Sequence, residues 1–167
     1  MEPSILVEQK VLHLFLHYKN CIAEAIENGI REEFFAKSHV NLFTAIYQEY
    51  LESSAGRLLT RNSYKQFLFN NNLNNNLNEE LSVYDHCLLT PFAKQDDFGS
   101  LVKLLIENYI KENTGKFLLE FKETSQKKGY THATQNLCDN LSGVLNSAKT
   151  VHKTVLKSID EMKDEFI

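Results

Sequence analysis

Apolar side chains recur at steps of three and four residues along almost the whole chain, the spacing that places them on one face of an α-helix. We therefore expect a succession of helices and no β-sheet. The short helices are expected over about 4–18, 20–28, 38–52, 60–69 and 78–89. A longer helix is expected over 96–128, and a return helix begins near Thr131.

Individual residues indicate where some of these helices begin and end. Ser38 and Thr60 are expected N-caps, because a short hydroxyl side chain can accept a hydrogen bond from a backbone amide in the first turn. Gly129 follows two lysines and suits the left-handed conformation that ends a helix. Between 70 and 78 the sequence is nearly all asparagine, which favours a mobile loop.

The long helix and the return helix are expected to form a helical hairpin that stands off a globular bundle. Apolar residues lie almost all round the long helix over 101–110, so this stretch should be covered from more than one side. We predict that the hairpin carries a protein interface. Its expected residues are Leu104, Tyr109, Phe117, Phe121, Leu137, Leu141 and Leu145.

The return helix carries a seam suited to coiled-coil packing. Cys138, Leu141, Leu145 and Ala148 step by three, four and three residues, and two further apolar residues widen the seam. Those two residues are Leu137 and Val144.

The last eighteen residues, 150–167, form a separate apolar stripe at helical spacing. We interpret them as a terminal helix with one apolar face. The residues on this face include Val151, Val155, Ile159, Met162 and Phe166. The predicted fold is thus all-α, with a globular helical bundle over 1–95, a helical hairpin over 96–149 and a linker helix over 150–167.

Composition supports this fold and argues against direct DNA binding. The 167 residues include two prolines, six glycines and no tryptophan, which favours helices over a turn-rich sandwich. The formal charge is −4, with eight basic against thirteen acidic residues over 1–100 and ten against nine over 101–167. Because phosphate neutralisation needs a basic patch, we expect little direct DNA contact.

The cysteines and the termini indicate a protein of the cytoplasm. Cys21, Cys87 and Cys138 are odd in number and far apart, so we expect small core hydrophobes in a reducing compartment. No signal peptide or membrane span is recognisable.

Motifs for chemistry are weak. The TGKF stretch at 114–117 lacks the first glycine and the final hydroxyl of a phosphate-binding loop. His13 and His17 have the spacing of a zinc-binding pair, and a metal-dependent hydrolase is one alternative, but no third ligand is indicated. We therefore expect a non-catalytic chain without cofactor or metal.

Four stretches, taken in order, resemble the N-terminal domain of bacterial replicative DNA helicases of the DnaB family. They are VEQKVLHLFL (7–16), EEFFAKSHVNLFTAIYQEY (32–50), LLTRNSYKQFL (58–68) and LLTPFAKQDDFGSLVKLLIENY (88–109), with the hairpin after them. The family's first motif is matched by Glu8, Gln9, Val11 and Leu12, and its second by Phe34, Phe35, His39, Leu42 and Phe43.

The resemblance implies a role in assembling a larger machine. In this family the hairpins pair across a two-fold to build a hexameric ring as a trimer of dimers. The resulting collar receives the primase and, in some systems, a helicase loader. The family's linker helix packs on the ATPase domain of the neighbouring subunit, so the resemblance implies that Val151, Val155, Ile159, Met162 and Phe166 are docking residues. ATP and Mg²⁺ belong to a RecA-like domain, which this chain lacks. Two alternatives are the helicase-binding domain of a primase and a stand-alone helical adaptor.

Overall fold

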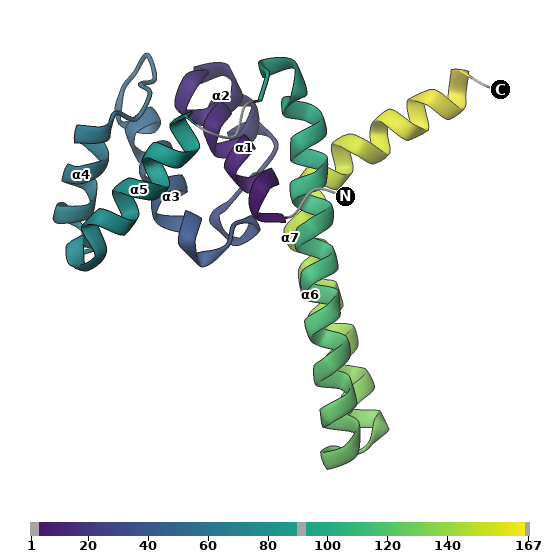
Figure 1. Ribbon diagram of the computed structural model, residues 1–167. Coiled ribbons are helices and arrows are strands. Elements are labelled where there is room, and N and C mark those ends of the chain that lie inside the picture. The colour runs from purple at the N-terminus through teal and green to yellow at the C-terminus, as the bar shows by residue number, and fades with distance from the viewer. Residues whose placement is uncertain (1–3, 90–92, 166–167) are drawn as a thin grey trace. The chain divides into compact units, whose positions relative to one another are not determined.

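The computed structural model describes the backbone of residues 4–89 and 93–165 and the side chains of residues 4–89 and 93–148. All regular structure within these residues is helical, which confirms the all-α fold with a bundle and a hairpin (Figure 1). The helices are α1 (Ser4–His17), α2 (Lys19–Glu27), α3 (Lys37–Glu52), α4 (Arg61–Asn70), α5 (Leu77–Leu89), α6 (Phe98–Lys128) and α7 (Tyr130–Glu165). Three short 3-10 turns are η1 (Glu32–Phe34), η2 (Asn74–Asn76) and η3 (Gln95–Asp97).

The chain divides into two compact units, Met1–Leu105 and Ile106–Ile167. The division falls inside α6. The first turns of α6 belong to the first unit, where the ring of Phe98 lies 5.9 Å from that of Phe15 on α1, and four of their side chains are buried. These are Phe98, Leu101, Val102 and Leu105.

Helix α1 is the central element of the first unit and packs against α2, α3 and α5. Its apolar residues come as neighbours in the sequence, as in Val11–Leu12 and Leu14–Phe15, and all four side chains are buried. Neighbouring residues on a helix point about 100° apart, so such pairs make an apolar face too wide for one partner helix. This width places α1 inside the bundle.

Hydrogen bonds donated to Glu80 on α5 hold α3 and α4 in place. Its carboxylate accepts a hydrogen bond from the Tyr64 hydroxyl on α4 at 2.7 Å and one from Asn41 Nδ2 on α3 at 3.0 Å. Tyr64 is fully buried, and burial is the main reason that the pKa of its phenol is raised. The neutral phenol therefore donates to Glu80 throughout the physiological pH range.

The first residues of α4 and α3 differ in where the acceptor for their backbone amides comes from. Thr60 caps α4 as expected, since its side chain accepts a hydrogen bond from the Ser63 amide at 3.1 Å. The expected cap at Ser38 is wrong: α3 begins at Lys37, its N-cap is Ala36, and that residue has no side-chain cap. The Ala36 amide instead donates to Glu8 Oε1 on α1 at 2.5 Å, so a carboxylate from a distant helix satisfies it.

The asparagine-rich stretch contains more regular structure than expected. The 3-10 turn η2 lies within it, and α5 begins directly after that turn, at Leu77. Asn72 has a φ of 57°, the left-handed conformation that asparagine tolerates better than most residues. The tract thus makes a tight connection between α4 and α5.

The second unit is a helical hairpin formed by 106–128 of α6 and by α7 (Figure 1). Gly129 ends α6 as expected, with a φ of 87° that favours glycine, and its carbonyl oxygen accepts from the Ala133 amide at 3.2 Å. The expected boundary between the hairpin and the terminal helix, at residues 149 and 150, does not interrupt α7, which continues to Glu165. No proline or glycine follows Gly143 to end the helix.

Candidate assembly surface

The residues expected to form the hairpin interface are only partly covered within this chain. Leu145 on α7 is 54% exposed. The other six are half-buried, namely Leu104, Tyr109, Phe117, Phe121, Leu137 and Leu141. The structure contains a single chain, so their role in an interface stays a prediction.

Three further large apolar side chains are exposed near the turn of the hairpin and were not among the expected residues. Leu118 is 53% exposed, Leu119 is 68% exposed and Tyr130 is 74% exposed. A signal for two of them was present in the FLLEF stretch at 117–121, because four apolar residues in five cannot all face one partner helix. Near these residues, the Phe121 and Tyr130 rings lie 6.4 Å apart between centroids and join α6 to α7.

The covered seam of α7 lies in a different register from the one expected. Ala133, Val144 and Ala148 are buried, and two half-buried leucines lie between them at helical spacing, Leu137 and Leu141. Cys138 and Leu145, which were expected in the seam, are exposed. Each follows a seam residue directly, and one residue turns the side chain by about 100°.

The expected docking residues of the terminal segment lie outside the described side chains. The backbone of α7 is helical to Glu165, so Val151, Val155, Ile159 and Met162 lie on this helix. Phe166 lies outside the described residues altogether. The docking function of this stripe therefore stays a prediction.

His13 and His17 join the end of α1 to the end of α5 through hydrogen bonds, with His13 half-buried and His17 exposed. Their ring centroids are 4.4 Å apart. His13 Nδ1 donates to the Cys87 carbonyl at 2.9 Å, and His17 Nε2 donates to the Leu88 carbonyl at 3.0 Å. Residues 4–89 and 93–148 contain no group of three or more potential metal ligands. The two rings satisfy carbonyls that the last turn of a helix leaves open.

The stability of the bundle is expected to depend on pH through His13. Burial, with a smaller contribution from His17, lowers the pKa of His13 below 6.5, against the opposing effect of its carbonyl hydrogen bonds. The unfolded chain therefore binds a proton at a higher pH than the folded chain does. Neutral His13 therefore stabilises the folded chain at any pH above the pKa that it has in the unfolded chain. This stabilisation is lost as the pH falls through the lower pKa that it has in the folded chain.

We expect His13→Asn to show a smaller loss of unfolding free energy than wild type as the pH falls from about 7 to about 5. Urea unfolding at a series of pH values measures this difference. His86→Asn is the matched control, since His86 is exposed on α5 and should leave the wild-type slope unchanged. Equal slopes for wild type and His13→Asn would contradict the assignment.

Two of the three cysteines behave as core residues. Cys21 and Cys87 are buried, and burial raises the pKa of their thiols to about 11 and about 12 respectively. Such thiols stay protonated and act as small hydrophobes. Cys138 is exposed on α7.

Comparisons of the chain with protein-family models, with curated proteins and with solved structures found no match. Among the described residues, no helix has the length and apolar character needed to cross a membrane.

Proposed function

We propose that this chain is a non-catalytic assembly and partner-docking domain of a DnaB-type replicative helicase. In this proposal the hairpins of two copies pair, the paired copies build a ring, and the resulting collar receives a primase or a loader. Unwinding and ATP hydrolysis belong to a separate RecA-like domain. The observation that carries the proposal is the exposure of three large apolar side chains on the hairpin, Leu118, Leu119 and Leu145, which the described part of the chain leaves more than half uncovered.

The energetics favour covering these side chains. Burying one leucine completely contributes about 1.5–3 kcal/mol relative to leaving it in water. Protein interfaces use apolar anchors of this kind. Here they are the exposed leucines on α6 and α7 and the half-buried aromatic rings on α6. A single exposed leucine would mean little, but several on one two-helix unit favour a second surface that covers them.

The bundle offers a second point of support. The first two motifs that resemble the helicase family contain Glu8 and His39, which are both buried. His39 Nδ1 lies 3.1 Å from Glu8 Oε1, and the same oxygen accepts the Ala36 amide. The two motifs therefore serve one structural purpose here, since they fix the start of α3 against α1.

Light scattering during gel filtration tests the proposal directly. We expect the wild-type chain to form dimers or larger species as its concentration rises. Phe117→Asp and Leu145→Asp should shift it to monomers, because a carboxylate placed in an apolar contact must be desolvated without a partner. Lys122→Asp is the matched control, since it places the same carboxylate at an exposed position of α6.

A wild-type chain that stays monomeric at millimolar concentration would overturn the proposed self-assembly. So would assembly that persists in both aspartate variants. Circular dichroism of each variant separates loss of assembly from loss of folding, because Leu145 is largely exposed and its replacement should leave the helical signal intact.

The helicase-binding domain of a primase is a second proposal that the same bundle and hairpin support. The reading frame after Ile167 separates the two. A RecA-like domain with a Walker lysine supports a helicase, and its absence supports a primase fragment or a stand-alone adaptor.

A further inference from the structure

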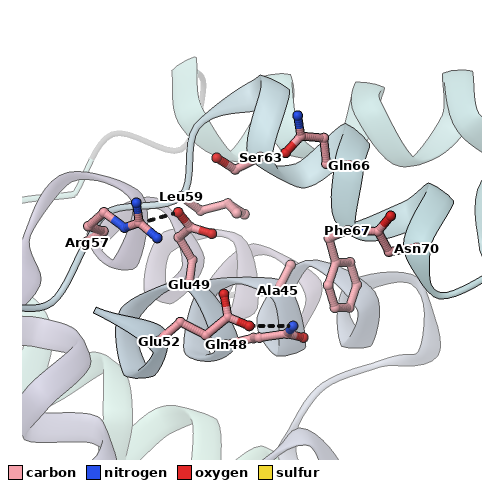
Figure 2. A pocket seen from close by; sticks show the side chains of 10 residues that line it. All are labelled: Ala45, Gln48, Glu49, Glu52, Arg57, Leu59, Ser63, Gln66, Phe67 and Asn70. Atoms are coloured by element: carbon pink, nitrogen blue, oxygen red, sulfur yellow. Dashed lines mark hydrogen bonds and ion pairs between the residues drawn. The ribbon is translucent and has the colours of Figure 1, made fainter. Parts of the chain in front are cut away.

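A polar pocket of about 290 Å³ lies between α3 and α4 in the first unit (Figure 2). Each helix contributes four residues at steps of three, one and three, which is one face of a helix. Residues from the connection between the helices complete the lining. The lining residues are Ala45, Gln48, Glu49 and Glu52 of α3, Arg57 and Leu59 of the connection, and Ser63, Gln66, Phe67 and Asn70 of α4.

The pocket exists because Ala45, a small residue, lies where a larger side chain would fill the space between α3 and α4. Ala45 and Leu59 are buried and form its apolar part, and Phe67 adds a half-buried aromatic ring. Because Ala45 has only a methyl group, it leaves space between the two helix faces. Hydrogen bonds to Glu80 hold both helices, so this space is built into the bundle.

The chemistry of the walls favours a cationic group that donates several hydrogen bonds. Two carboxylates, Glu49 and Glu52, face one guanidinium, that of Arg57, so the lining has a formal charge of −1. Glu52 Oε1 accepts a hydrogen bond from Gln48 Nε2 at 2.9 Å. A carboxylate can accept about four hydrogen bonds, so Glu52 can accept further donors beside Gln48.

The ion pair of Arg57 with Glu49 shows that the carboxylates of this pocket can bind a guanidinium. Its Nε lies 3.4 Å from Glu49 Oε1, and its side chain is 60% exposed while that of Glu49 is 19% exposed. An ion pair with one exposed partner is weak and exchanges readily with other donors. A guanidinium from outside can therefore bind Glu52, beside the Arg57–Glu49 pair. The edge of the site already contains one guanidinium bound to a carboxylate, that of Arg57.

Size and charge narrow the class of ligand. Pockets for whole small molecules are usually about 300–1,000 Å³, so this one is at the lower limit and suits one long side chain. Its acidic character disfavours phosphate groups. A planar guanidinium carries five N–H donors in a fixed fork, so it suits these acceptor-rich walls better than an ammonium does.

We infer that the pocket between α3 and α4 binds an arginine side chain of a partner protein, with Glu52 as the main acceptor. The inference does not rest on assembly through the hairpin, because all the lining residues belong to the first unit.

Nuclear magnetic resonance titration of the full chain with N-acetyl-arginine amide tests the inference. We expect saturable shifts of backbone amides over 45–52 and 63–70, with a dissociation constant in the millimolar range. Glu52→Gln should weaken binding roughly ten-fold, because it removes the charge from a charge-assisted hydrogen bond. Glu107→Gln is the matched control, since Glu107 is exposed on α6 and its replacement should change nothing.

Three results would overturn the inference. The first is the absence of saturable shifts over 45–52 and 63–70. The second is equal binding of N-acetyl-citrulline amide, which has the same shape without the charge. The third is equal affinity of the wild-type and Glu52→Gln chains, provided that the variant spectrum shows the wild-type fold. Phe117→Asp should bind the probe as wild type does, which keeps this test separate from that of hairpin assembly.

Discussion

Replacing Phe15 by alanine is expected to lower the free energy of unfolding of the bundle by about 3–5 kcal/mol. Phe15 is fully buried on α1. Its ring centroid lies 5.9 Å from that of Phe98, 6.1 Å from that of Tyr47 and 6.4 Å from that of Phe43. Removing the ring leaves a cavity among three aromatic side chains that cannot all move to fill it, and one of them is the first residue of α6.

Urea unfolding followed by the near-ultraviolet circular dichroism of tyrosine measures this change. Five of the seven tyrosines lie within the first unit, so the signal reports mainly on the bundle. Phe69→Ala is the matched control, since Phe69 is 47% exposed on α4 and its truncation should cost less than about 1 kcal/mol. Equal effects of the two substitutions would show that the aromatic cluster does not stabilise the bundle.

Replacing Glu8 by alanine is expected to destabilise the bundle by about 3 kcal/mol. The Glu8 side chain is 4% exposed, as is that of His39. Its Oε1 accepts hydrogen bonds from the Ala36 amide at 2.5 Å and from His39 Nδ1 at 3.1 Å. Alanine removes the acceptor and leaves two donors unsatisfied in or near the core, each at a cost of about 1–3 kcal/mol.

A double-mutant cycle distinguishes this explanation from simple loss of packing. We expect Glu8→Leu combined with His39→Leu to be more stable than the sum of the two single changes predicts, because the double variant leaves no buried partner of the pair unsatisfied. Glu24→Ala on α2 is a suitable control, since Glu24 is exposed. Additive effects of the two leucine substitutions would mean that Glu8 and His39 stabilise the bundle independently.

Local features of the chain were predictable to the extent that their physical cause is local. The cap at Thr60 and the stop at Gly129 depend on residues within one helical turn, and both are present in the structure. The cap at Ser38 failed because the acceptor for the Ala36 amide is Glu8, which is 28 residues away in the sequence. No pattern within the third helix carries that information.

The register of the hairpin was harder to predict for a similar reason. Two overlapping series of residues on α7 have nearly the same spacing, one through Leu141 and Leu145 and the other through Leu141 and Val144. Spacing cannot decide between them, because the choice depends on which face the neighbouring surface covers. The structure buries Val144 and leaves Leu145 exposed.

The pocket between α3 and α4 could not have been found in the sequence, since its polar residues resemble any solvated helix face. The sequence by itself determined an all-helical chain with a bundle and a hairpin. It could do so because these features depend on short stretches of the chain, namely on helical periodicity, on the scarcity of glycine and proline, and on the residues that begin and end single helices. Only the tertiary structure decided that Glu8 meets His39 and that Glu52 shares a pocket with Phe67. Such pairings depend on which faces of separate helices come together, and that is settled by packing across the whole bundle.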